Sequence, residues 1–193
     1  MTAVTYDDAL SALEARLGHK AAKHCKRVAA TAAELAAAYG VDVEVARLAG
    51  LLHDWDRETP PETLLMAAAS DGLEVSDADA ANPHLLHART GAVAVREAFP
   101  ELPAEVTQAI ARHTLGAADM TPLDMVVYLA DMIEPHRDFG GVEQLRDAVG
   151  KVSLPELFAL GYQRSVRYLF DARKPIHPDT VAVWNALVAG DPS

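Results

Sequence analysis

Cysteine is nearly absent from this 193-residue sequence, and so are the marks of an exported protein. The single cysteine, Cys25, has no partner for an internal disulfide. The opening stretch MTAVTYDDAL has neither the basic start nor the apolar run of a signal peptide. These absences argue against a disulfide-stapled secreted protein, and we expect a reducing, cytoplasmic setting.

Long apolar runs and positive charge are also scarce. The segment 126–130 is short and lies between Asp124 and Asp131, whereas a membrane-spanning helix needs ~20 apolar residues. The 17 Lys and Arg residues are outnumbered by 28 Asp and Glu residues, which gives a net charge of -11 and repels a nucleic-acid backbone. We therefore expect a soluble protein without a membrane or nucleic-acid partner. Bound cations could still let a small polyanion bind.

Alternation of β-branched and polar residues, the mark of half-buried strands, is rare as well. Long stretches of Ala, Leu, Glu and Arg fill the chain instead and favour helices. Hydrophobic residues make up 50% of the sequence, enough for one full core but not comfortably for two. We expect an all-α fold in a single domain, residues 1–193, without repeats, a coiled coil or a glycine-rich phosphate loop.

Glycine and proline mark the expected helix boundaries. Gly40 suits a left-handed helix end, and Asp42 can cap the next helix, which delivers His53 and Asp54 near its end. Proline fits the first turn of several later helices, where no amide donor is lost. Residues 71–82 should form a loop with at most one helical turn. The expected helices span about 19–39, 43–54, 62–70, 83–98, 103–113, 122–134, 142–149, 155–172 and 178–188.

One set of residues stands out, because imidazole and carboxylate groups are the ligands of mixed nitrogen and oxygen metal sites. Its members are about one helix and one connection apart, so successive helices of a bundle could each present a ligand to one cavity. For each histidine taken alone, an ordinary core or boundary position stays open. Asp131 follows an apolar run, and a buried carboxylate needs a cation or several donors. The set comprises His24, His53, Asp54, His87, His113 and Asp131.

The order of these residues resembles a known motif. His24, the pair His53-Asp54 and Asp131 follow the H...HD...D pattern of the HD-domain metal-dependent phosphohydrolases. Four longer segments resemble the YqeK family, bacterial HD-domain hydrolases that split diadenosine tetraphosphate symmetrically into two ADP. These segments are LLHARTGA (85–92), AIARHTLG (109–116), VVYLADMIEPHR (126–137) and KPIHPDT (174–180). The resemblance implies a helical HD-domain bundle with a motif-bearing core at about 18–140 and C-terminal helices at about 141–190.

The resemblance also implies two divalent metal ions, usually iron, although His and Asp ligands accept manganese, cobalt, nickel or zinc as well. A hydroxide held between the metals would attack a phosphorus next to the central bridging oxygen and release ADP from each half. The motif assigns four ligands to one metal and three to the other, with one shared. They are His24, His53, Asp54 and Asp131 for the first, and His87, His113 and again Asp54 for the second.

Protein cations should assist the reaction by stabilising charge on the phosphoryl oxygens. Our candidates are Arg57 and Arg137, of which Arg137 lies in the family-like segment EPHR. The alternative for Arg137 is a surface ion pair with Glu134 or Asp138.

Several neighbours of the motif are candidates for substrate contact. Thr114 and Gly116 could let the chain approach a phosphate closely or could form an ordinary helix C-terminus. His136, beside Arg137, is the extra histidine that we expect nearest the substrate. His84 competes with His87 for the ligand position, and the motif favours His87. The remaining histidines, expected at the surface or behind the ligands, are His19 and His177.

Two positions depart from the family pattern. Cys25 stands where Ser or Thr is common, so a thiol, which is a weaker hydrogen-bond donor, replaces a hydroxyl. Arg57 stands where Lys is common, so a planar guanidinium replaces a compact ammonium. Neither change removes a ligand. Aromatic residues are possible adenine-stacking groups, although in a bundle they more often belong to the core. They are Trp55, Tyr128, Phe139 and Trp184.

Three competing functions remain open at this stage. An HD phosphohydrolase acting on another nucleotide would share the same metal motif. A cyclic-dinucleotide phosphodiesterase is disfavoured because no Gly-Tyr-Pro follows a downstream histidine-rich segment. A non-catalytic helical binding module, stabilised by metal, is disfavoured because all six ligand positions are filled. The oligomeric state cannot be predicted from the sequence.

Overall fold

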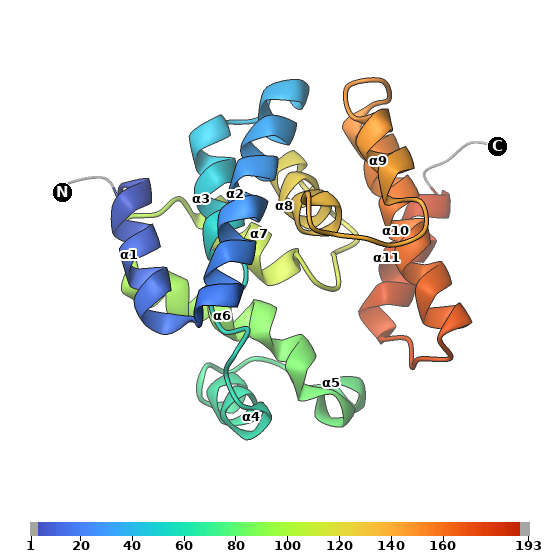
Figure 1. Ribbon diagram of the computed structural model, residues 1–193. Helices are drawn as coiled ribbons and strands as arrows, with labels where there is room; N and C mark the ends of the chain where they lie inside the picture. The colour runs from blue at the N-terminus through green and yellow to red at the C-terminus, as the bar shows by residue number, and fades with distance from the viewer. Residues whose placement is uncertain (1–3, 190–193) are drawn as a thin grey trace.

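The computed structural model describes residues 4–189, and every regular element in that range is a helix (Figure 1). The expected all-α fold is confirmed. Residues 1–3, part of the stretch considered for a signal peptide, and residues 190–193, the end of the expected domain, lie outside the described range. Within that range no helix combines the length and apolar character that crossing a membrane requires.

The helices are joined by turns and short loops. In chain order they are α1 (Tyr6–Arg16), α2 (His19–Tyr39), α3 (Val43–Leu52), α4 (Pro61–Ser70), α5 (Asp77–Ala81), the 3-10 helix η1 (Pro83–Leu86), α6 (His87–Ala98), α7 (Ala104–Arg112), α8 (Pro122–Ile133), α9 (Val142–Ala148), α10 (Leu154–Asp171) and α11 (Pro178–Ala189). Most boundaries agree with the expected ranges to within two residues.

Two helices differ from expectation for local reasons. α1 lies before the first expected helix and buries only Ala9 and Leu13, too few residues to show a helical period in the sequence. α5 extends slightly beyond the single turn expected between α4 and η1. Ser76 and Asp79 form a reciprocal capping box there, which satisfies main-chain donors that a loop would leave free.

The helix expected over 83–98 is divided in two. Pro83 begins the 3-10 helix η1, and the α-helical geometry starts only at His87. A proline marks where a helix can begin but does not determine which kind of helix follows. The division places His87 at the junction, where its side chain turns into the interior.

α2 and α3 form a closely packed antiparallel hairpin. Gly40 ends α2 with φ 72°, and the Asp42 side chain caps α3 by accepting from two main-chain amides. A Cβ added at Gly50 would lie 3.0 Å from the Cβ of Ala32, so the two helices can approach this closely only with glycine there. The hairpin brings the beginning of α2 beside the end of α3.

The remaining helices are arranged around and beyond this hairpin, with α1 packed against it and α9, α10 and α11 on the far side of α8 (Figure 1). α7 and α8 pack against it and α6 packs against α7, whereas α10 packs against the other side of α8 with α9 and α11 as neighbours. One hydrophobic core cluster extends from Ala9 in α1 to Val183 in α11. The ends of α2, α3, α6, α7 and α8 therefore meet in the interior, with the C-terminal helices beside them.

Candidate metal centre

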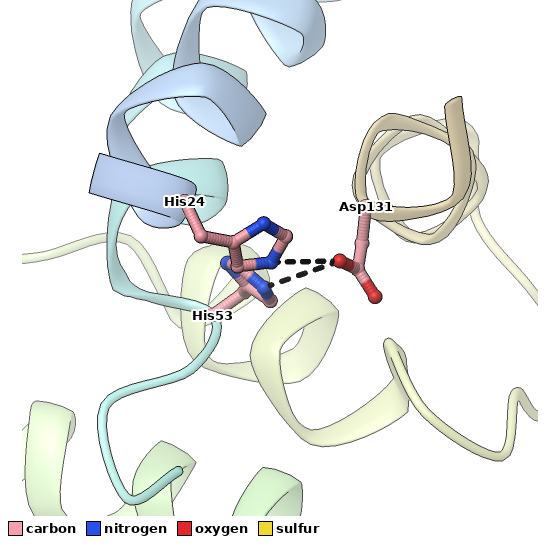
Figure 2. A group of neighbouring side chains, drawn as sticks. All are labelled: His24, His53 and Asp131. Atoms are coloured by element: carbon pink, nitrogen blue, oxygen red, sulfur yellow. Dashed lines mark ion pairs between the residues drawn. The ribbon is translucent and has the colours of Figure 1, made fainter. Parts of the chain in front are cut away.

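Five helix segments bring the six motif residues together. His24 lies on α2, His53 follows α3 as its C-terminal cap with Asp54 next, His87 begins α6, His113 caps α7, and Asp131 lies on α8. Figure 2 shows the His24 and His53 imidazoles turned toward the Asp131 carboxylate, which faces them from α8.

Three of the histidines are held in the same way. The Nδ1 atoms of His53, His87 and His113 lie 2.8, 2.6 and 2.7 Å from the carbonyl oxygen three residues earlier. A carbonyl can only accept, so Nδ1 carries a proton, and in the neutral imidazole Nε2 keeps its lone pair. Nε2 of His53 is buried and has no hydrogen-bond partner among the described residues. A buried, unpaired lone pair is an available metal ligand.

Asp54 divides its two oxygens between two pairs of imidazoles. Oδ1 lies 3.1 Å from Nε2 of His87 and 3.5 Å from Nε2 of His113. Oδ2 lies 3.4 Å from Nε2 of His53 and 3.7 Å from Nε2 of His24. Burial alone would raise the pKa of Asp54, but the neighbouring imidazoles hold it well below its usual value. The carboxylate is therefore ionised and suited to bridge two cations.

Asp131 completes the half of the site that contains His24. Its Oδ1 lies 2.9 Å from Nε2 of His24 and 3.7 Å from Nε2 of His53 (Figure 2). Burial opposes its ionisation, but the contacts with His24, His53 and Arg137 keep the pKa of Asp131 below its usual value. Burial also lowers the pKa of His113 and so favours the neutral imidazole that metal binding requires.

These distances fit metal coordination. Metal–ligand bonds of ~2.0–2.2 Å place neighbouring ligand atoms about 3.0–3.5 Å apart, and the contacts around Asp54 and Asp131 range from 2.9 to 3.7 Å. Two groups of three have ligand atoms within 4.8 Å of one another, namely His24, His53 and Asp131, and His53, Asp54 and His113. The donor set of imidazoles and carboxylates can hold a divalent metal ion.

Glu134 supports the centre and was not among the predicted site residues. Its Oε1 lies 3.2 Å from Nδ1 of His24, so this carboxylate orients the imidazole as the carbonyls orient the other three. Glu134 is 2% exposed and accepts a 2.6 Å hydrogen bond from Nε of Arg27. Burial opposes its ionisation, but the Arg27 bond and the His136 amide hold its pKa at about 2. Its position one helical turn after Asp131 was the available sequence signal.

Both predicted arginines lie at the centre. Arg137 bonds to the Asp131 carboxylate and donates from Nε to its main-chain oxygen at 2.7 Å, in place of the surface pairs considered with Glu134 or Asp138. Arg57 is less tightly held, with Nε 3.9 Å from Oδ2 of Asp54. The Arg57 side chain is 45% exposed and can reach a ligand in the cavity.

Of the residues predicted to contact the substrate, Thr114 lies at the centre, whereas Gly116 and the His136 side chain do not. Oγ1 of Thr114 lies 3.0 Å from Nε2 of His113, directly at the centre. Gly116 instead forms the turn after α7, with φ 76°, and an added Cβ would lie 3.2 Å from the Tyr162 ring. The His136 side chain is exposed, and its contact with the site is the main-chain N–H bond to Glu134 at 2.8 Å.

Other residues singled out in the sequence lie away from the ligands. His84 stacks on His87, with ring centroids 5.2 Å apart, and accepts the Nδ1 hydrogen bond of His87 through its carbonyl. His177 was expected at the surface or behind the ligands, but it is 5% exposed and pairs with Asp79, because the loop before α11 folds back onto α5. Its contacts belong to a cavity wall and not to the metal ligands.

Cys25, the other position that departs from the family pattern, lies in the core, and the aromatic candidates divide between the core and the cavities. Cys25 is fully buried in the core, and burial raises the pKa of its thiol, so it remains protonated. Trp55 packs edge-to-face on Phe99 in the core, and Trp184 also packs against the core. Tyr128 and Phe139 are the two aromatic candidates that line cavities.

Three neighbouring cavities surround the centre. The central cavity, about 290 Å³, is lined by Asp54, Arg57, His87, His113 and Thr114 together with residues of α8 and α10. The apolar cavity, about 600 Å³, lies between α5, α10 and the loop before α11, and its walls include Leu85, Leu115, Tyr162 and Leu169. The arginine cavity, about 530 Å³, lies between the loop 135–141 and α10 and contains Arg137, Arg164 and Arg167.

Comparison with known proteins agrees with this geometry. The HD domain family model matches residues 21–135, more than half of the chain. The chain is 32% identical over 184 residues to the symmetrical bis(5'-nucleosyl)-tetraphosphatase of Bacillus subtilis, covering 95% of this chain and 98% of the relative. It is 34% identical over 183 residues to the protein of the same name from Halalkalibacterium halodurans, covering 93% and 95%.

The fold has a counterpart among solved structures. The crystal structure of a predicted HD superfamily hydrolase involved in NAD metabolism from Clostridium acetobutylicum superposes with a TM-score of 0.91 and is 32% identical in sequence. The match covers 98% of this chain and 100% of the other. The order of the motif, the convergence of its residues and these likenesses lead to one assignment: the chain belongs to the HD-domain family and, within it, to the YqeK family.

Proposed function

We propose that this protein hydrolyses diadenosine tetraphosphate symmetrically into two molecules of ADP. The observation that carries the proposal is the position of Asp54, whose two oxygens face different imidazole pairs in a cavity that adjoins two further cavities. A reaction at the middle of a long substrate needs its reactive centre in the middle of the binding site. The names of the relatives from Bacillus subtilis and Halalkalibacterium halodurans support the same substrate.

The six motif residues would hold two divalent ions, for which iron is the proposed identity. When bound, such ions act as Lewis acids toward phosphoryl oxygens and lower the pKa of water. In the reaction, water adds to a phosphorus beside the central bridging oxygen, the bond from that phosphorus to the bridging oxygen breaks, and both halves leave as ADP.

Two arginines of the protein offset the negative charge of the substrate. The chain carries a net charge of -11, which would repel a tetraphosphate, but Arg57 and Arg137 both line the central cavity. Arg137 is anchored by Asp131 and is therefore already oriented before the substrate arrives. A preorganised cation stabilises developing charge without reorganising during the reaction. Thr114 supplies a hydroxyl at the same place.

The apolar cavity is suited to one nucleoside of the substrate. It shares Thr114, Tyr128 and Ser165 with the central cavity, so a ligand can extend from one into the other. Aromatic and aliphatic walls with a few polar groups are typical of small-molecule sites. Lys174 lines this cavity as well, with its ammonium 4.9 Å from the centroid of the Tyr168 ring, and it adds positive charge beside the nucleoside. We assign the protein to the cytoplasm, where its single buried thiol would stay reduced.

Product analysis tests the proposal directly. The protein would be prepared anaerobically with ferrous ion and given diadenosine tetraphosphate, and the nucleotides would be separated by chromatography. ADP as the sole product, absent with His53→Ala, is the expected result. ATP plus AMP would contradict symmetrical cleavage. Lack of turnover with any divalent metal would indicate a different nucleotide substrate or a non-catalytic module.

The His53→Ala variant also separates catalysis from structure. The imidazole is fully buried, so its removal leaves a cavity, and thermal unfolding should be measured beside turnover. A folded variant that has lost turnover supports a catalytic metal. A variant that unfolds would point to a metal whose role is structural.

A further inference from the structure

The arginine cavity differs from the apolar cavity in ways that suit a second ligand group. Its walls contain three arginines, Arg137, Arg164 and Arg167, against a single aspartate, Asp171. In a chain with 28 acidic and 17 basic residues, such a concentration of positive charge is unusual. The cavity also has two partly exposed aromatic side chains, Phe139 at 37% and Tyr168 at 57%.

The arginine cavity is continuous with the metal centre. Four residues line both this cavity and the central cavity, namely Met132, Arg137, Phe139 and Ser165. Arg137 is the charged link, because it bonds to Asp131 and also faces the arginine cavity. A polyphosphate that leaves the centre on this side therefore meets a cation first.

α10 borders both outer cavities. Ser165 and Tyr168, three residues apart and hence on one face of the helix, line both the apolar and the arginine cavity. Ser165 is fixed by a 2.9 Å hydrogen bond to the Tyr128 hydroxyl, and the Tyr168 ring carries the Lys174 ammonium 4.9 Å from its centroid. The two outer cavities are thus neighbours along α10, and both share Ser165 with the central cavity.

The loop that carries Phe139 is held in place. Arg164 donates to the Gly140 carbonyl at 2.8 Å and also bonds to Gln144. Its guanidinium occupies the space beside Gly141, where an added Cβ would lie 1.8 Å from Nη1. The Arg164 guanidinium is therefore occupied by hydrogen bonds to Gly140 and Gln144. Arg167, in contrast, is exposed and takes part in no ion pair between described residues, so its charge is available to a ligand.

We propose that the arginine cavity binds the second nucleoside diphosphate of the substrate, with Phe139 stacking on the base and Arg137 and Arg167 facing the phosphates. This inference rests on the proposed function, since symmetrical cleavage requires a nucleoside and two phosphates on each side of the reacting bond. The two identical halves of the substrate thus occupy chemically different subsites. One is the apolar cavity, and the other is an arginine-rich cavity with exposed aromatic side chains.

Two substrates distinguish the subsites. Diadenosine tetraphosphate fills both. Adenosine 5'-tetraphosphate lacks the second nucleoside but keeps all four phosphates, and it should be split into ADP and pyrophosphate with its nucleoside in the apolar cavity. Phe139→Ala should raise KM for the dinucleotide roughly 5- to 100-fold, as expected for the loss of one base stacked on an aromatic ring. KM for adenosine tetraphosphate should change less than about twofold. Arg167→Ala should instead raise KM for both substrates, because both carry the phosphates that Arg167 faces.

The matched control is Phe170→Ala. Phe170 is an aromatic side chain of α10 that is 65% exposed and lines none of the three cavities, and its removal should leave both KM values unchanged. An equal change for both substrates with Phe139→Ala, or no change for either, would overturn the second subsite.

Failure of the proposed function can be told apart from failure of the subsite. If the wild-type protein does not cleave the dinucleotide, the proposed function is wrong, and equilibrium dialysis with labelled ADP and ferrous ion then tests the subsite alone. Two ADP molecules bound per wild-type chain and one per Phe139→Ala chain would support it. One ADP per wild-type chain would refute it.

Discussion

The helices up to α8 and those after it contribute different things to the same site. All six motif residues lie between His24 and Asp131, within the matched range 21–135. The segment after α8 supplies no motif ligand, yet Ser165, Tyr168 and Lys174 line the cavities beside the centre. Substitutions of the motif residues should therefore change turnover and metal binding, whereas those of residues after α8 should change substrate affinity and stability.

Asp54→Ala should have the largest effect on turnover. Asp54 is the only carboxylate that faces all four motif histidines among the described residues, so its removal takes a ligand from both halves of the centre. We expect kcat/KM for diadenosine tetraphosphate to fall at least about 10³-fold, because both the metals and the activated water depend on it. Steady-state kinetics with metal analysis of the purified variant would measure this.

Asp56→Ala is the matched control for that substitution. Asp56 is also a buried aspartate, 4% exposed, but it bonds to Arg16 and not to the histidines. Its loss should lower stability and leave the metal content unchanged. Equal losses of metal in the two variants would mean that burial, and not position in the centre, explains the effect.

Glu134→Gln should have the next largest effect. The substitution keeps the shape of the side chain but removes the charge that His24 and Arg27 share. Loss of a group that orients a metal-binding histidine typically costs 10–100-fold in metal affinity or activity, and we expect a decrease of about that size in kcat/KM. Metal titration should show the same decrease. The control is Glu143→Gln. Glu143 is an exposed ion-pair partner of Arg146, and its substitution should change neither kcat/KM nor metal affinity.

Asp79→Asn tests the connection between α5 and the C-terminal part. Asp79 is 1% exposed and lies 2.8 Å from the Arg89 guanidinium and 3.3 Å from Nε2 of His177. Removing one partner of a buried ion pair leaves the other uncompensated, and we expect a loss of about 2–3 kcal/mol in unfolding free energy. Denaturant unfolding would measure it. Asp77→Asn, exposed on the same helix, should cost less than about 0.5 kcal/mol.

The pH dependence gives a second check on Asp79. Burial opposes its ionisation, but hydrogen bonds from Ser76 and Arg89 lower the pKa of Asp79 in the folded protein. A lowered carboxylate pKa contributes stability above the pKa of the unfolded chain, about 4, and loses it as the pH falls through the folded value. The stability difference between wild type and Asp79→Asn should therefore be largest near neutral pH and shrink in acid. A constant difference would mean that the charge is unimportant.

The convergence of the six motif residues could be predicted from the sequence because the motif fixes their order. Spacing alone only permitted a shared cavity, and the HD motif supplied the assignment. Glu134 was missed because its role depends on His24, which lies 110 residues away in the sequence. His177 was misplaced for the same reason, since its partner Ser76 is 101 residues away. Partners this distant are set by packing and leave no local pattern.

Helix boundaries followed a similar rule. Gly40 and Asp42 fix the hairpin of α2 and α3 through their own backbone conformation and capping, so these boundaries were predicted closely. α1 was missed because its two buried residues give no amphipathic pattern. The cavities could not be predicted at all, because they arise where α8, α10 and the loop before α11 approach one another in the folded chain.

Tyr162→Phe should have the smallest effect and tests whether the C-terminal part only shapes the cavity. The Tyr162 hydroxyl donates to the Leu115 carbonyl at 2.7 Å, and its ring is 1% exposed, so the change removes a hydrogen bond and keeps the packing. We expect a loss of about 1 kcal/mol in unfolding free energy and a decrease of about 2–4 °C in Tm.

Since Leu115 follows Thr114 at the centre, an unchanged kcat would support a division of roles between the two parts. A large loss of kcat would instead show that the C-terminal helices also position the metal ligands. Tyr6→Phe is the control, because it removes a tyrosine hydroxyl far from the cavities, where the Tyr6 ring packs against Arg47.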